Sequence, residues 1–66
     1  MHIRLNGDDR AIADASTLAQ LVDQLDLAGK RIAIEVNDEL VPRSEHAQHT
    51  LSEGDSVEIV QAIGGG

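Results

Sequence analysis

The residues best suited to chemistry lie at the end of this chain, where Ile63 is followed by Gly64, Gly65 and Gly66. Glycine has no Cβ, so a glycine run fits a narrow channel and adopts dihedral angles that other residues avoid. The residues beyond Ala62 reach roughly 13 Å when extended, far enough to carry a terminal carboxylate into a cleft on another protein. The Gly66 carboxylate would be unhindered for attack on a phosphorus atom. A frayed chain end is the alternative explanation, and composition alone does not separate the two.

A carboxylate becomes an acyl donor only after activation, for example by adenylation with ATP. The sequence contains no GxxxxGK phosphate-binding loop, no cysteine and no recognisable pair of nucleophile and base. We therefore expect no catalytic residues in this chain and interpret it as a protein co-substrate and not an enzyme. ATP and Mg would be used by an activating partner, and this chain would bind no cofactor itself.

Histidines and acidic residues give little support for a metal site. His46 and His49 are three residues apart and His2 is remote in sequence, whereas metal sites usually need three or four convergent ligands. We expect isolated surface histidines and no bound metal. Asp8 and Asp9 are interpreted as part of a solvated turn, because the other ligand positions of a calcium loop are missing.

Composition narrows the class of partner. The 66 residues include 5 Lys and Arg against 12 Asp and Glu, a formal charge of −7, and no aromatic Phe, Tyr or Trp. Nucleic-acid binding needs cations and usually aromatic stacking, and anionic membranes also attract cations, so we expect neither partner. The opening residues lack the features of a signal peptide. We expect a soluble cytoplasmic protein of one small domain.

Hydrophobic periodicity predicts the elements that would position the tail. The expected order is a strand over His2–Asn6, a return strand over Arg10–Asp14, a helix from Ser16 or Thr17, a strand over Arg31–Asn37, a short strand over Glu39–Val41, an irregular or 3₁₀ turn over 44–49 and a last strand over Ser56–Ala62. The first and last strands are expected at the centre of the sheet. This order predicts an α+β fold of the β-grasp (ubiquitin-like) type, a mixed sheet packed on one main helix. The domain would span residues 1–62, followed by a flexible glycine tail over 63–66.

Local signals mark the turns and the helix. Asn6-Gly7 predicts a tight turn, and Asn37-Asp38 is a second candidate. Thr17 and Gln20 fit a capping box at the start of the helix. Leu18, Leu21, Val22 and Leu25 follow at the spacing of a core-facing stripe. Gly29 is expected in a left-handed stop or a loop after the helix.

Four short motifs, in order along the whole chain, resemble the ThiS family of sulfur carriers in thiamine biosynthesis. They are Val36-Asn37, Leu40-Val41-Pro42-Arg43, Gly54-Asp55 and the terminal Gly65-Gly66. Each is weak alone, and the combination at this length is more specific. Two positions depart from the family pattern: His46 stands where relatives often have an aromatic residue, and Gly64 extends the usual Gly-Gly ending.

The resemblance implies a cycle centred on Gly66. A ThiF-type enzyme would adenylate its carboxylate, and sulfur from cysteine, passed as a persulfide by a cysteine desulfurase, would replace AMP to give a thiocarboxylate. The sulfur would then be delivered at thiazole synthase (ThiG). Ile63, Gly64 and Gly65 would be the residues by which partners recognise the tail.

Candidate contacts with partners are Arg43 near the predicted 3₁₀ turn and an apolar strip formed by Ala33, Val60 and Ala62 on the sheet face away from the helix. Both have ordinary explanations, a charge beside a turn and plain strand surface. Two other functions remain open: a MoaD-like carrier of molybdopterin synthase, and a non-covalent β-grasp interaction module with incidental glycines. Covalent tagging of other proteins is also compatible with the sequence.

Overall fold

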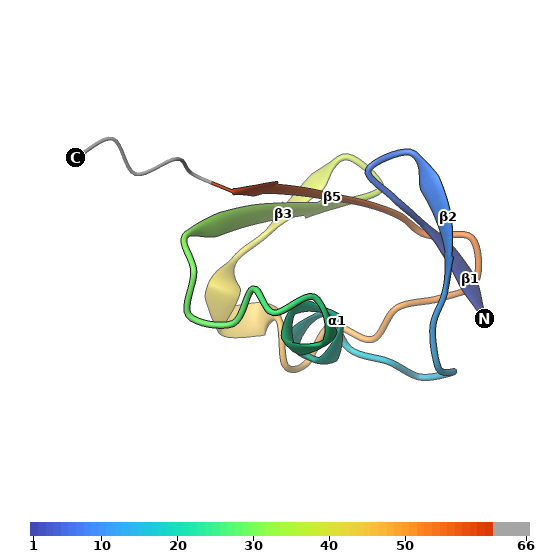
Figure 1. Cartoon of the computed structure of the whole chain (residues 1–66), viewed down its shortest axis with the longest axis horizontal. Helices are drawn as coiled ribbons and strands as arrows, with labels where there is room; N and C mark the ends of the chain where they lie inside the picture. Colours follow the sequence, from blue (N-terminus) through green and yellow to red (C-terminus); the bar gives the residue numbers. More distant parts are fainter. Residues whose placement is uncertain (62–66) are drawn as a thin grey trace.

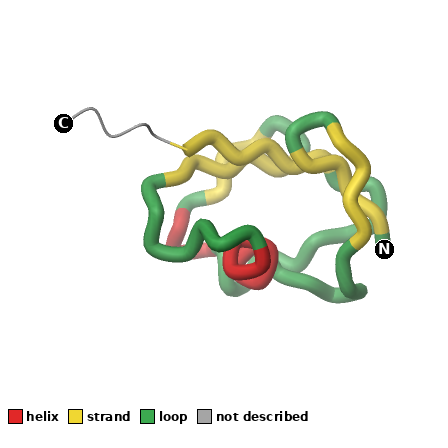
Figure 2. Tube along the Cα trace, in the orientation of Figure 1, coloured by secondary structure: helices red, strands yellow, loops and turns green. Residues whose placement is uncertain are grey.

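The computed structural model describes residues 1–61 as a mixed sheet of five strands with one α-helix packed against it (Figures 1 and 2). Along the chain the elements are β1 (His2–Leu5), β2 (Asp8–Ala11), α1 (Leu18–Gln24), β3 (Ile32–Val36), β4 (Glu39–Val41), a 3₁₀ helix η1 (Arg43–Glu45) and β5 (Ser56–Gln61). The strand order in the sheet is β2-β1-β5-β3-β4. β5 pairs parallel with β1 and antiparallel with β3. The predicted β-grasp arrangement, with the first and last strands at its centre, is confirmed.

Two tight turns close the hairpins at either edge of the sheet. Asn6 and Gly7 have φ values of 51° and 89°, and Asn37 and Asp38 have φ values of 52° and 68°. Two consecutive positive φ values give the type I′ geometry, whose twist matches that of paired strands. The return strand therefore begins at Asp8, earlier than the predicted Arg10, because a two-residue turn already places Asp8 opposite Leu5.

The helix begins as the sequence predicts. The Thr17 hydroxyl accepts a hydrogen bond from the Gln20 N–H, and the Gln20 side chain accepts one from the Thr17 N–H, which completes the capping box. The helix ends at Gln24, and the left-handed residue that follows is Asp26, with φ 60°. The Leu27 N–H bonds back to the Val22 carbonyl, as in a Schellman motif. Gly29, with φ 80°, lies farther along in the connection to β3, so the loop is the alternative that the structure shows.

The core lies between α1 and the inner face of the sheet. Its fully buried side chains are aliphatic: Ile3, Leu18, Leu21, Ile34 and Val57. They come from α1 and from the three inner strands, so burial of one helical stripe against alternating strand residues explains the fold. The helix stripe is as predicted, with Leu25 half-buried at its end.

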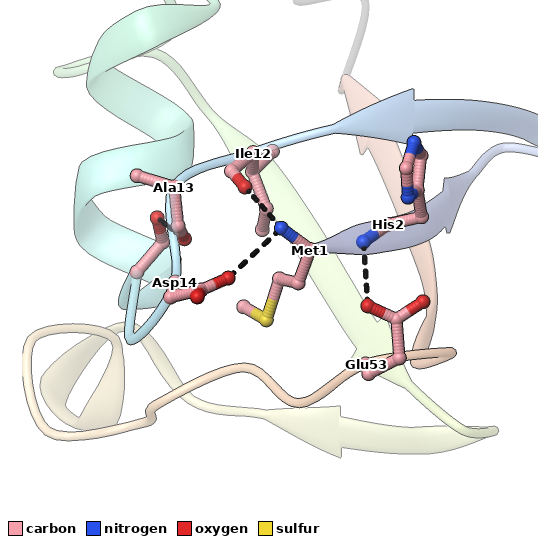
Figure 3. A network of polar contacts seen from close by, with 7 residues as sticks. Met1, His2, Ile12, Ala13, Asp14 and Glu53 are labelled. Atoms are coloured by element: carbon pink, nitrogen blue, oxygen red, sulfur yellow. Dashed lines mark hydrogen bonds and ion pairs between the residues drawn. The ribbon is translucent and has the colours of Figure 1, made fainter.

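The amino terminus is held by the loop after β2 (Figure 3). The Met1 ammonium group donates to the Ile12 carbonyl at 2.8 Å and pairs with the Asp14 carboxylate at 2.9 Å. The His2 N–H donates to the Glu53 carboxylate, which comes from the turn before β5. These contacts fix the start of β1 beside the start of the central strand.

Residues 62–66 lie outside the described part of the chain. The predicted boundary between a domain over 1–62 and a tail over 63–66 therefore stays a prediction. Across residues 1–61, no helix has the length and apolar character needed to cross a bilayer.

Candidate functional site

The predicted reactive tail follows directly from the central strand β5. β3 pairs with β5 from Val57 to Gln61, and the last described pair is Ile32 with Gln61. β1 pairs with only the first part of β5, at Ser56 and Val57. The strand that leads into the tail is therefore anchored in the middle of the sheet. The predicted modified residue and the residues predicted to recognise partners lie beyond it, outside the described residues: Ala62, Ile63, Gly64, Gly65 and Gly66.

Two asparagine side chains continue the pairing of β5 beyond its backbone partners. The Asn6 side chain accepts a hydrogen bond from the Ile59 N–H at 2.9 Å and donates to the Ile59 carbonyl at 3.3 Å. The Asn37 side chain accepts from the Ser56 N–H and donates to the Asp55 carboxylate, both at 3.0 Å. Each asparagine also takes a positive φ in its turn, so both residues shape a hairpin and hold the central strand.

The outer face of the sheet carries the predicted apolar strip. Val60 lies opposite Ala33 in the β3–β5 pairing and both side chains are exposed, Val60 to 66%. The structure adds Leu40 of β4 to this apolar strip. Leu40 is also 66% exposed, and it lies opposite Glu35 of β3. Sequence reasoning missed Leu40, because only the register of β4 against β3 places it on this face.

Acidic side chains adjoin this strip. Glu35 and Glu58 face each other across β3 and β5, and their carboxylates lie within 4.8 Å of that of Asp38 in the β3–β4 turn. Alternation along each strand predicts that both glutamates face outward. Their convergence with Asp38 depends on the register of β3 against β5, which the sequence alone does not give. Exposed like charges at this spacing favour a nearby cation or a basic partner group. The three carboxylates are at the surface, and no further observation points to a bound metal ion.

Arg43 lies in η1, at the end of the molecule where β5 ends (Figure 1). Its guanidinium group donates to the backbone carbonyl of Lys30 in the connection between α1 and β3. A hollow of about 250 Å³ lies beside it, between α1, this connection and η1, and is lined mainly by aliphatic side chains such as Val22, Leu27 and Ile32. The Arg43 side chain is thus exposed but held at the edge of an apolar depression.

His46 corrects the interpretation of the histidines as surface residues. Its side chain is 8% exposed, and Nε2 lies 3.0 Å from the Val41 carbonyl oxygen. A carbonyl oxygen only accepts, so Nε2 carries the proton in this contact. His46 therefore fills a core position after η1. Neither it nor the other histidines belong to a cluster of ligand-type side chains within residues 1–61.

Comparison with known proteins assigns the family. Residues 3–66 match the model of the ThiS family. The chain belongs to the ThiS family. It is 35% identical to the sulfur carrier protein ThiS of Escherichia coli, with 100% of both chains covered. Its fold matches the crystal structure of a thiamine biosynthesis protein (ThiS) from Geobacter metallireducens with a TM-score of 0.85 and 28% identity over the whole of both chains.

One relative is much longer than this chain. The ThiS-family chain is 38% identical over all 66 residues to the thiazole synthase of Paramagnetospirillum magneticum, but it covers only 20% of that protein. The chain therefore spans about a fifth of that relative. A segment similar to this ThiS-family chain occurs both as a small protein on its own and within a much longer one.

Proposed function

We propose that this ThiS-family chain carries sulfur for thiazole formation in thiamine biosynthesis, as a thiocarboxylate on Gly66. The observation that carries the proposal is the match along the whole chain to the Escherichia coli sulfur carrier protein ThiS. The family match reaches Gly66 as well. In this role the chain is a co-substrate of partner enzymes and contributes a carboxylate and a recognition surface.

The chemistry begins at the Gly66 carboxylate. One of its oxygens attacks the α-phosphorus of ATP, held with Mg by a ThiF-type enzyme, and pyrophosphate leaves. The terminal sulfur of a persulfide, supplied through a cysteine desulfurase, then attacks the acyl carbon and displaces AMP. A thiol cleaves the resulting sulfur–sulfur bond and releases the thiocarboxylate. The chain has no cysteine, so the transferred sulfur travels on the terminus and not on a side chain.

The anchoring of β5 supports a tail that works in a partner's site. β5 is paired on both sides at its start, where Asn37 also bonds to Ser56, and Asn6 extends this hold to Ile59. A partner that grips the body of the domain therefore also fixes the point at which the tail begins. Ile63, Gly64 and Gly65 would then span the distance into the partner's cleft.

The outer face of the sheet is the surface proposed to hold the body. Val60 and Leu40 are large apolar side chains that remain two-thirds exposed, as expected for side chains buried only in a complex. Glu35 lies opposite Leu40 on one side and Glu58 on the other, and Glu58 lies two residues before Val60 in β5. We propose that Ala62 continues this surface. It would fit a partner face with an apolar centre and basic groups at its rim.

Thiazole synthase is proposed as the recipient of the sulfur. A segment similar to this chain lies within a longer protein named thiazole synthase, and physical linkage of two proteins raises their effective concentration for each other. This observation favours thiazole formation over a MoaD-like role in molybdopterin synthesis. We further propose that the cycle runs in the cytoplasm, where the activating enzyme has access to ATP.

Reconstitution with purified partners tests the proposal. The full chain with its native Gly66 end is incubated with ATP, Mg, a ThiF-type enzyme and a cysteine desulfurase, followed by ThiG with its small-molecule substrates. We expect pyrophosphate release that depends on the carrier, and then thiazole formation. A variant lacking Gly65 and Gly66 should support neither step. Full activity of that variant would contradict the carrier function and favour the non-covalent module, whereas sulfur delivery only to molybdopterin synthase would favour the MoaD-like role.

A further inference from the structure

Three of the cationic side chains gather where the central strand ends. Gln61 pairs with Ile32, so Lys30 and Arg31, which immediately precede Ile32, lie beside Gln61, the last described residue of β5. The Arg43 guanidinium group bonds to the Lys30 carbonyl and joins the same group. In Figure 1 the α1–β3 connection and η1 lie at the same end of the molecule as the end of β5, opposite the amino terminus.

This cationic collar, defined as Lys30, Arg31 and Arg43, differs from the rest of the molecule. The chain has 5 Lys and Arg in total, and the other two are Arg4 and Arg10 on the β1–β2 hairpin. The 12 Asp and Glu give the chain a formal charge of −7. Three of the five cationic side chains therefore lie at the tail end, where the carboxylates of Asp26 and Glu45 are also found.

The charges of the collar are available for a partner. All three side chains are exposed. Within residues 1–61, no carboxylate oxygen lies within 4.0 Å of their charged nitrogen atoms, so none of the three forms an ion pair there. Arg43 is already oriented by its bond to Lys30, which reduces the conformational entropy lost when it binds a carboxylate. Arginine also binds carboxylates through two parallel hydrogen bonds.

An apolar depression adjoins the collar. The hollow of about 250 Å³ is lined by Val22, Leu27, Ala28 and Ile32, with Arg43 at its edge. Aliphatic walls beside exposed cations match a segment that presents an aliphatic side chain next to carboxylates. This chemistry is opposite in sign to the partner surface that fits the acidic outer face of the sheet.

We propose that the cationic collar and its hollow bind an acidic segment, bearing an aliphatic residue, at the rim of the opening through which the tail enters its activating enzyme. The inference rests on the proposed function, since it requires a partner that accepts the tail. An acidic rim attracts the collar and repels the rest of the domain, so the carrier approaches with its tail foremost. Complementary charges of this kind raise the association rate and suppress wrong orientations.

Charge reversal at the two ends of the molecule tests the collar. The test variant is Lys30→Glu with Arg31→Glu, and the matched control is Arg4→Glu with Arg10→Glu at the opposite end. Both lower the formal charge equally, so a difference between them reports position and not net charge. Carrier-dependent pyrophosphate release by the ThiF-type enzyme is measured at low and high salt. We expect the KM for the collar variant to rise at least about tenfold at low salt, with kcat unchanged, and the difference to shrink as salt screens the charges.

Two further variants keep the test independent of folding. The neutral change Lys30→Gln with Arg31→Gln should give a smaller rise in KM in the same direction. Ala28→Phe, which fills the hollow, should also raise KM, whereas Ala11→Phe on the exposed far strand should not. Thermal unfolding of every variant identifies any effect that arises from lost stability.

The outcomes separate this inference from the function on which it rests. If wild type acquires AMP and sulfur but the collar and control variants have equal KM values, the collar is contradicted and the carrier function stands. An equal KM for Ala28→Phe and Ala11→Phe would likewise remove the hollow from the interface. If wild type itself acquires neither AMP nor sulfur, the proposed carrier function is contradicted, and so is the proposed role of the collar, which depends on it.

Discussion

His46 offers a direct test of how the structure holds η1 and Arg43 in place. Its ring donates to the carbonyl of Val41 at the end of β4, and its own carbonyl accepts from the Ala19 N–H in α1. The residue thus connects β4, η1 and the helix around a buried side chain. We predict that His46→Ala destabilises the domain strongly.

The magnitude follows from two losses. Removal of the imidazole deletes its hydrogen bond to the Val41 carbonyl, a net loss of about 0.5–1.5 kcal/mol. It also leaves a cavity, and large-to-small changes in a core cost about 2–5 kcal/mol in total. A combined loss of about 3–4 kcal/mol is a large part of the roughly 3–10 kcal/mol expected for a domain of this size. It would lower Tm by more than about 10 °C.

Thermal and urea unfolding monitored by circular dichroism measure the effect. His49→Ala is the matched control: His49 is half-buried, and its side chain makes no hydrogen bond within residues 1–61, so we expect a loss below about 1 kcal/mol. His46→Phe should fall between the two, because it restores the volume but not the hydrogen bond. Equal losses for His46→Ala and His49→Ala would refute the assignment of His46 as a core residue.

Three further predictions concern the core, the amino terminus and the outer face. Leu21→Ala should lower the free energy of unfolding by about 2–5 kcal/mol, because Leu21 is fully buried and leaves a cavity; a loss below 1 kcal/mol in urea unfolding would contradict the packing. Asp14→Asn should lower it by no more than about 1 kcal/mol, and less at high salt, because the Asp14 side chain is 89% exposed in its pair with Met1; a larger loss that is insensitive to salt would contradict a surface ion pair. Val60→Asp should raise the KM for the activating enzyme about tenfold, since burial of the two-thirds exposed side chain is worth about 1–2 kcal/mol. An unchanged KM, equal to that of an Ala13→Asp control in the exposed loop after β2, would exclude this face from docking.

Local interactions explain which elements were predictable from sequence. The capping box at Thr17 and the type I′ turn at Asn6-Gly7 involve neighbours in the chain, so their residue types alone determine them. The alternation in β3 and the apolar stripe of the helix, which ends at Leu25, correctly predicted which side chains face the core. A helix and a sheet that each have one apolar face can bury those faces in only a few ways. The end of the helix was less predictable, since Asp26 takes a left-handed conformation that glycine usually occupies.

The missed features depend on contacts between segments far apart in the sequence. Leu40 joins Val60 on the outer face only through the register of two strand pairs. His46 is buried where the segment after η1 lies against α1, with the Ala19 N–H bonded to the His46 carbonyl, and nothing in its neighbouring residues signals that contact. The cationic collar likewise depends on the contact between Arg43 and the carbonyl of Lys30. These residues are separated in sequence, and only the fold brings them together.

The central claim is that Gly66 carries the sulfur, and the intact mass of the chain tests it most directly. Protein with its native carboxyl end is incubated with ATP, Mg, a ThiF-type enzyme and a sulfur source, beside a variant that lacks Gly66 and a known carrier as positive control. We predict a mass gain equal to the replacement of one oxygen by sulfur, present in the full chain and absent from the variant. An unchanged mass of the full chain, with no transient AMP adduct while the known carrier is converted, would contradict the claim.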